Sequence, residues 1–195
     1  LNTSFINIED CKIAGLTGGE YIYGIQTYNP ESTMIKNCTI SGLKNPSSVT
    51  TQLANTYFYG IHCDSDASYE TQYKSATITN CFIELLSTYN LQVTAGQYQY
   101  GIYLNRLKTF VFDNTISIIN TVGRSLGITW PSYGIANDSR VSSIVRNVVQ
   151  SSCRNFATPY TGNYTPSYTT IDNYGVSGST YYVNNNIYIE GVIGV

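Results

Sequence analysis

The amino-acid sequence predicts an all-β solenoid, a right-handed parallel β-helix of about five to six coils. Two recurring motifs predict this fold. One is the tripeptide Tyr-Gly-Ile, and the other is a hexapeptide about a dozen residues later with Cys or Asn at its fourth place. Both motifs return along nearly the whole chain of 195 residues, so we expect a single domain over residues 1–195. Periodic self-similarity of this kind is typical of solenoid proteins.

The first motif places tyrosines at regular intervals. Copies of Tyr-Gly-Ile recur every 33 to 41 residues, with Tyr-Gly-Val as the last copy; they begin at Tyr23, Tyr59, Tyr100, Tyr133 and Tyr174. Tyr and Ile are two residues apart, so an unbroken strand would place both on one face. We expect the five tyrosines to stack as an aromatic column near a corner, where their hydroxyls reach a polar partner or water.

The second motif predicts a bend. Copies occupy residues 35–40, 78–83, 111–116 and 144–149, an incomplete copy covers 8–13, and the register of a last copy around 184–186 is ambiguous. The first and last residues of a copy are five apart, which is the wrong parity for one unbroken strand. A tight bend before the fourth place explains the slip. The residues at the fourth place of each copy would then stack as a polar ladder. The ladder contains Cys11, Cys38, Cys81, Asn114, Asn147 and one of the last Asn residues.

A two-sheet sandwich is the alternative fold, since it also consists of short strands at regular spacing. It does not explain why the same tripeptide and the same change of phase recur together. Helices are not expected, because no apolar pattern with a period of 3.6 residues persists for three turns.

The pattern resembles the right-handed parallel β-helix superfamily, which contains pectate-lyase-like enzymes, phage tailspikes and repeat-bearing surface adhesins. The resemblance covers about Phe5 to Val192 and rests on the coil repeat and the Asn/Cys ladder. It implies the solenoid fold and a protein that binds or cleaves acidic polysaccharides, or one that acts only as a stalk or adhesin. Fold alone does not choose among these functions.

One polar cluster is the strongest candidate for chemistry. Asp64 and Asp66 follow His62 directly after a Tyr-Gly-Ile strand, and Glu70 comes shortly afterwards. The three carboxylates could bind Ca²⁺, which prefers several oxygen ligands, and Asp64 with Asp66 could supply a pair for glycoside hydrolysis. The simpler interpretation is a solvated turn capped by Asp and Ser, with His62 exposed on the surface.

A basic pair lies one coil later, at Arg106 and Lys108. Arg106-Leu107-Lys108 is similar to the Arg-Ile-Lys motif of polygalacturonases, but the Gly-His-Gly and the adjacent Asp pair of those enzymes are missing. We therefore expect surface residues here, with Arg106 as a weak catalytic candidate.

Tyrosines in the expected loops, outside the Tyr-Gly-Ile motif, form a second candidate surface. With Ser, Thr, Asn and Gly around them, they have the composition of a recognition surface, and aromatic rings suit sugars. The candidate ligand-binding residues are Tyr57, Tyr89, Tyr98 and Tyr164. The alternative is that the loops only cover the coils.

The five cysteines do not indicate a metal site. No Cys-x-x-Cys pair occurs and the sequence has one His, so no zinc site and no other cofactor is expected, apart from the weakly supported Ca²⁺. Stacked cysteines lie within disulfide reach, but their side chains point the same way. We expect small buried free thiols, including an inward-facing Cys63.

Composition excludes some partners. The chain has 10 Lys+Arg without a basic run, which argues against nucleic acid, and no run of about 18 apolar residues that would span a membrane. Charged residues make up only 11% of the sequence, and this low charge suggests an extracellular protein or one at a cell or virion surface.

Both ends read as uncapped strands, at residues 5–8 and 187–195. Solenoids usually carry polar caps. We therefore expect either a segment of a longer chain or subunits that associate with one another through open ends. The first functional hypothesis is a structural, fibre-forming or adhesive protein without catalytic activity. The alternatives are a polysaccharide-processing lyase or hydrolase and a glycan-binding module.

Overall fold

The computed structural model is all-β in the part of the chain that it describes. Every regular element in that part is a strand, and no helix occurs among these residues. The described residues are 4–18, 20–43, 56–65, 74–87, 97–120, 132–138, 141–153, 168–173, 180–183 and 186–191.

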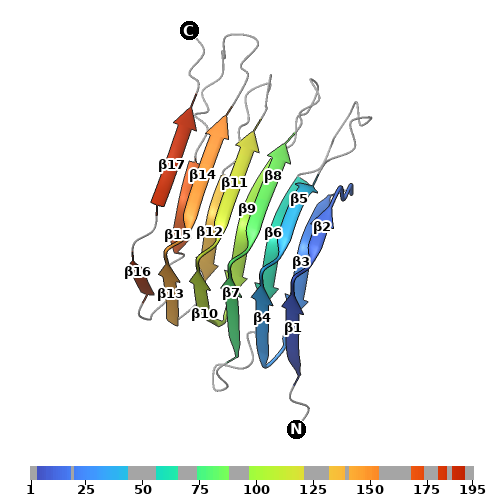
Figure 1. Ribbon diagram of the computed structural model, residues 1–195, viewed down its shortest axis with the longest axis vertical. Helices are drawn as coiled ribbons and strands as arrows, with labels where there is room; N and C mark the ends of the chain where they lie inside the picture. Colours follow the sequence, from blue (N-terminus) through green and yellow to red (C-terminus); the bar gives the residue numbers. More distant parts are fainter. Residues whose placement is uncertain are drawn as a thin grey trace.

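The strands form three sheets, and consecutive strands of the chain belong to different sheets (Figure 1). The first sheet has the order β1 (Phe5–Glu9), β4 (Ser32–Lys36), β7 (Ser75–Thr79), β10 (Lys108–Phe112), β13 (Val141–Val145) and β16 (Thr180–Val183). The second contains β2 (Lys12–Ala14), β5 (Thr39–Leu43), β8 (Phe82–Ser87), β11 (Thr115–Asn120), β14 (Val148–Cys153) and β17 (Asn186–Gly191). The third contains β3 (Tyr21–Tyr28), β6 (Thr56–Asp64), β9 (Gln97–Asn105), β12 (Ser132–Asp138) and β15 (Tyr168–Asn173).

All strand pairs among the described residues are parallel, which is the arrangement of a β-solenoid and not that of an antiparallel sandwich. Within a sheet, each strand pairs with the strand that lies three elements away in the chain, such as β4 with β1 and β7. The chain therefore passes through the three sheets in turn and then returns to the first, one step along the stack. Parallel pairing requires such long connections, and here the other two sheets supply them.

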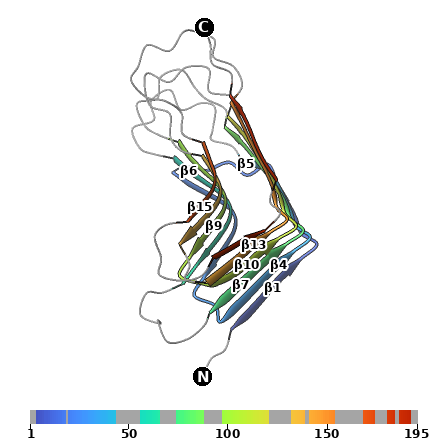
Figure 2. The same cartoon turned by 90° about the vertical axis from the view of Figure 1, so that its left-hand side faces the viewer.

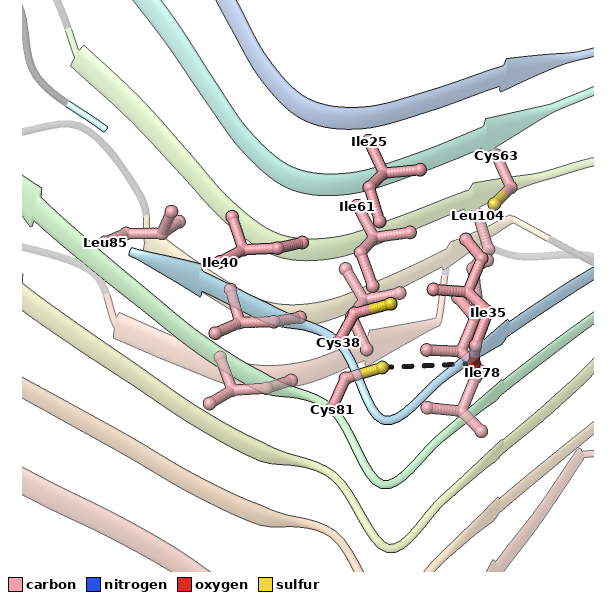
Figure 3. Packing of buried hydrophobic residues seen from close by; sticks show 14 of the residues in the cluster. Ile25, Ile35, Cys38, Ile40, Ile61, Cys63, Ile78, Cys81, Leu85 and Leu104 are labelled. Atoms are coloured by element: carbon pink, nitrogen blue, oxygen red, sulfur yellow. Dashed lines mark hydrogen bonds between the residues drawn. The ribbon is translucent and has the colours of Figure 1, made fainter. Parts of the chain in front are cut away.

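The core consists of aliphatic columns to which all three sheets contribute. The register places like residues beside each other, and their side chains are buried: Ile35, Ile78 and Val111 from the first sheet, Ile40, Ile83 and Ile116 from the second, and Ile25, Ile61 and Ile102 from the third. Figure 3 labels Ile25, Ile35, Ile40, Ile61 and Ile78 of these columns. β-Branched side chains pack well on pleated surfaces, and each burial stabilises the fold by about 1.5–3 kcal/mol.

The predicted bend between the first and second sheets is confirmed. One residue per bend has a positive φ, directly before the ladder position; these residues are Asp10 (55°), Asn37 (55°), Asn80 (52°), Asp113 (59°) and Arg146 (53°). Asn and Asp tolerate this left-handed conformation better than other non-glycine residues do. The bend reverses the parity of the chain, so both halves of the hexapeptide point Ile or Val into the core.

The polar ladder that follows the bend is also confirmed for the described residues. Asn147 Oδ1 accepts hydrogen bonds from Asn114 Nδ2 (3.0 Å) and from the Asn114 backbone N–H (3.1 Å). Asn114 Oδ1 accepts the backbone N–H of Cys81 at 2.9 Å. Both amides also donate to backbone carbonyls, which satisfies buried polar groups at the bend. The last positions, Asn184 and Asn185, lie outside the described residues.

Cysteine replaces asparagine in the earlier part of the ladder, as free thiol. Cys38 and Cys81 are buried with their sulfurs pointing the same way (Figure 3), and each donates to the carbonyl two residues earlier, at 3.3 and 3.4 Å. Cys63 is buried on the third sheet as predicted. Cys11 is exposed, so the prediction of a buried thiol is wrong there; all four cysteines are unpaired. Burial raises the pKa of the Cys81 and Cys63 thiols to about 11, so both stay protonated near neutral pH.

The predicted orientation of the Tyr-Gly-Ile motif is wrong. Ile22 and Ile25 are both buried, whereas Tyr21 and Tyr23 stack on each other on the outer face. Gly24 faces inward too, because a Cβ built on it would lie 2.5 Å from Ile40 Cγ2. The strand therefore slips phase at the glycine, and tyrosine and isoleucine point to opposite sides.

This phase change bends the third sheet toward the second. Figure 2 shows the third sheet bowed, with the middle of the bow turned toward the second sheet. At Gly60 an added Cβ would lie 2.4 Å from Ile83 Cγ2 and 2.5 Å from the Gly101 carbonyl oxygen. Only glycine, which has no Cβ, allows the backbone at this position to lie so close to the Ile83 side chain and the Gly101 carbonyl. This requirement explains why the tripeptide recurs.

The prediction of a fifth tyrosine in the column is also wrong. The register runs from Tyr23 through Tyr59, Tyr100 and Tyr133, and then reaches Thr169. Tyr174 lies outside the described residues. Because β15 ends at Asn173, before that tripeptide, the residue that pairs with Tyr133 is Thr169.

We expect Gly60→Ala to destabilise the fold by about 3 kcal/mol, since the new methyl group has no room between Ile83 and the Gly101 backbone. Gly15→Ala is the control. Gly15 has φ +71° but open space around its Cβ position, so strain alone should cost about 1 kcal/mol. Urea unfolding measures both free energies, and equal losses would contradict the packing argument.

We expect Asn114→Ala to lower the free energy of unfolding by about 3 kcal/mol. The substitution removes the hydrogen-bond partner of the Cys81 backbone N–H and of the Ile78 and Phe112 carbonyl oxygens. Asn114→Cys should cost less, since cysteine already fills the equivalent positions. Asn80→Gly removes one exposed hydrogen bond, to Asn37, while it tolerates the left-handed φ of 52° at this position, and should cost below about 1 kcal/mol. Chemical denaturation ranks the three variants by their free energy of unfolding. If Asn114→Cys is as unstable as Asn114→Ala, cysteine and asparagine are not equivalent at this position of the ladder.

Candidate functional site

The outer face of the third sheet carries stacked tyrosines. Tyr23, Tyr59 and Tyr100 form a central column, with ring centroids 5.0 and 4.8 Å apart and planes inclined by 11° and 6°. Tyr21 and Tyr57 form an outer pair beside it, at 4.9 Å and 6°. The parallel register places these rings one strand step apart, which is a stacking distance for aromatic rings.

Two further rings cover the central column. His62 lies 5.4 Å from the Tyr23 ring and 4.9 Å from the Tyr59 ring. Tyr103, the register neighbour of His62, stands across the edges of Tyr59 and Tyr100 at interplanar angles of 76° and 79°. The phase change at glycine brings positions three residues apart onto one face. Tyr59 is consequently only 9% exposed although it points outward.

Burial changes the acidity of these groups. Desolvation raises the pKa of the Tyr23 and Tyr59 hydroxyls, and neighbouring tyrosines raise that of Tyr59 further. Desolvation lowers the pKa of His62, an effect that the Asp64 carboxylate partly opposes. His62 Nδ1 is buried, and it has no hydrogen-bond partner among the described residues. The imidazole is therefore held neutral against the tyrosine rings. Its predicted outward direction is confirmed, but it is half-buried rather than exposed.

Asp64 lies at a structural corner. Its Oδ1 accepts a hydrogen bond from Asn105 Nδ2 at 2.8 Å, and its carbonyl oxygen accepts the Asn29 backbone N–H at 2.8 Å. Lys74, only 5% exposed, donates through Nζ to the side-chain and backbone oxygens of Asn29. These contacts hold Asp64 between neighbouring coils, and the turn predicted to follow it lies outside the described residues.

Of the other predicted catalytic and metal-binding residues, Arg106 alone belongs to the described part of the chain. Arg106 is exposed, with φ 57° at the bend after β9. Asp66 and Glu70 lie outside the described residues. Among described residues, no group of three or more His, Cys, Asp or Glu is placed to hold a metal ion.

The predicted ligand-binding tyrosines are only partly described. Tyr57 and Tyr98 lie in strands, not in loops as expected, and they are register neighbours. Tyr89 and Tyr164 lie outside the described residues, as does the side chain of Tyr98. Sequence reasoning missed Tyr21, although a Tyr-x-Tyr-Gly-Ile pattern at Tyr21, Tyr57 and Tyr98 carries the signal. In each copy the two tyrosines are two residues apart on one strand, so they share a face, and the first tyrosines of the copies indicate a second outward column.

Stacking limits what this surface can do. A ring inside the central column has both faces against neighbouring rings, so only its edge and hydroxyl are left, and at Tyr59 these are largely covered as well. Sugars usually bind on an open aromatic face. In this arrangement, open faces occur only where a column ends or a ring stands apart. The surface is therefore a row of ring edges and hydroxyls rather than a set of aromatic platforms.

Comparisons with known proteins leave the family open. No protein-family model, curated protein or solved structure matches the chain. Separately, none of the described segments contains a helix long and apolar enough to cross a membrane.

We expect stability to fall as the pH drops below about 6.5, because the unfolded state binds a proton at His62 more readily than the folded state. The pKa of His62 is lower in the folded state than in the unfolded state. The contribution of His62 to the free energy of unfolding is therefore fully present at pH values above the ordinary histidine pKa, and it is lost as the pH falls toward the folded-state pKa. His62→Gln should flatten this dependence. His62 is the only histidine in the sequence, which makes the assignment clean.

Urea unfolding between pH 7.5 and 5.5 measures the effect, and the histidine proton resonances give the folded pKa directly. The groups that face the ring are Tyr23, Tyr59, Tyr103 and Asp64. A folded pKa at or above 6.5 would mean that the Asp64 charge outweighs desolvation.

Proposed function

We propose that this chain is a structural, fibre-forming or adhesive protein of the extracellular space or a cell or virion surface, and that it has no catalytic activity. In this proposal the solenoid is a right-handed parallel β-helix of about five to six coils. The preferred right-handed crossover between parallel strands supports the handedness. The low charge and the many uncharged polar residues support the location.

The observation that carries the proposal is the edge of the stack. β1, β2 and β3 are each the end strand of their sheet, so in the described part of the chain each pairs on one side only. An edge strand presents unpaired N–H and C=O groups that can template further pairing. Phe5 on β1 is 75% exposed, and Ile8 and Ile13 are only partly buried against the core. We propose that copies of the chain associate through such edges.

The contacts of the polar side chains support the proposal that the chain has no catalytic activity. Asp64 is bonded to Asn105, and Asp113 forms a bidentate pair with Arg146 at 2.6 Å on the outer bend. Asn37 likewise donates to Asp10 at 3.0 Å. These groups join one coil to the next, which is a structural task.

The first test is electron microscopy and sedimentation of the purified chain over a range of concentrations. We expect threads or a concentration-dependent series of oligomers. Ile8→Lys places a charge on the inward face of β1 and should suppress association. Met34→Lys adds the same charge on the exposed face of β4 and should not. A chain that stays monomeric throughout, or equal behaviour of both variants, would refute edge association.

Glycan recognition is the second candidate, and the tyrosines that remain open favour it. Tyr28 on the outer face of β3 is 65% exposed, and its register neighbour is Asp64 rather than a tyrosine. A glycan array with the chain and with Tyr28→Ala tests binding. Release of reducing ends from acidic polysaccharides, lost in Asp64→Asn, would instead support a polysaccharide-processing enzyme and overturn the non-catalytic proposal.

A further inference from the structure

One lysine amine is enclosed at the corner where the chain passes from the third sheet to the first. Lys74 directly precedes β7 and is only 5% exposed. Its Nζ donates to Asn29, which directly follows β3, at the side-chain oxygen Oδ1 and at the main-chain oxygen, the latter at 3.4 Å. The contact therefore joins two segments that are 45 residues apart in the sequence.

Lys74 occupies an inward position of the coil. The register of β7 with β10 puts Leu107 beside Lys74 in the next coil. Leu107 is 4% exposed and belongs to the hydrophobic core. A lysine at the place of a core leucine is largely withdrawn from water, so its amine is kept beside the amide of Asn29.

Backbone hydrogen bonds hold both partners in place. The Asn29 N–H donates to the Asp64 carbonyl oxygen at 2.8 Å, and the Lys74 carbonyl oxygen accepts the Lys108 N–H at 2.9 Å. Each of the two segments is thus tied to the following coil close to the contact. Two groups that are held together in this way react far faster than the same groups in free solution.

Pro30 closes a competing reaction of the Asn29 amide. An asparagine side chain can lose ammonia when the backbone nitrogen of the following residue attacks Cγ. Proline has no N–H, so this attack is not open to an Asn-Pro pair. The Lys74 amine, by contrast, contacts the Oδ1 that is bonded to the same Cγ.

We propose that Lys74 and Asn29 form a covalent isopeptide bond once the chain has folded. Nζ of Lys74 attacks Cγ of Asn29 and forms the new C–N bond, the bond from Cγ to Nδ2 breaks, and the proton lost by the amine passes to the departing nitrogen. Counted from the ammonium form of the lysine, the products are the cross-link and one ammonium ion. The reaction needs no oxidant, reductant or further reactant. The inference goes beyond the proposed structural role and does not depend on it.

The test is intact-mass spectrometry of the folded chain, followed by tryptic mapping. We expect the mass to be lower than the sequence mass by one ammonia molecule, and the peptides that contain Asn29 and Lys74 to be joined. Chain that is recovered unfolded and held in urea should keep the full mass until it is refolded, because the two groups meet only in the folded structure. A full mass after long incubation of the folded chain, or a loss of ammonia without joined peptides, would overturn the proposal.

Three variants separate the covalent bond from the hydrogen bonds. Lys74→Arg keeps a cationic donor but lacks the amine, and Asn29→Gly tolerates the φ of 60° but lacks the amide, so neither should lose ammonia at this site. Asn29→Asp should form the same bond with the release of water. Circular dichroism confirms that each variant is folded. Ammonia loss in Lys74→Arg equal to that of the native chain would assign the loss to other residues and refute the cross-link.

Discussion

Parallel pairing between successive coils is the constraint on which the rest of this structure depends. It places each residue about one strand spacing, roughly 4.8 Å, from its equivalent in the next coil. Any residue type that recurs at one position therefore becomes a continuous column. Isoleucine columns form the core, asparagine and cysteine columns hold the bend, and tyrosine columns cover the third sheet. One geometric rule thus produces stability, shape and surface chemistry together.

The close approach of the third and second sheets follows from the same rule. Glycine at the middle of β3 and β6 lets the backbone reach the side chains of Ile40 and Ile83, where no Cβ fits. The resulting phase change turns Tyr59 and His62 onto one outer face. Packing inside the solenoid therefore determines the aromatic arrangement outside it, and a single glycine position links the two.

Columns also explain why polar groups are tolerated inside a narrow core. A buried Asn114 would be costly alone, but its amide meets Asn147 on one side and the Cys81 backbone on the other. Cysteine suits the same place because its thiol is small and stays protonated when buried. At the exposed bend, Arg146 and Asp113 make the equivalent link by charge, and the Arg146 guanidinium lowers the pKa of that carboxyl.

The sequence by itself determined the solenoid class, the bend before the ladder and the inward cysteines, because each depends on a repeated local pattern. The tertiary structure alone decided which way the tyrosines point. Strand parity assigned Tyr23 and Ile25 to one face, but the steric conflict at Gly24 comes from Ile40, a residue on another sheet. Likewise, the pairing of Tyr21 with Tyr57 and the cover of Tyr103 arise between coils. Local periodicity does not contain contacts that form only when coils stack.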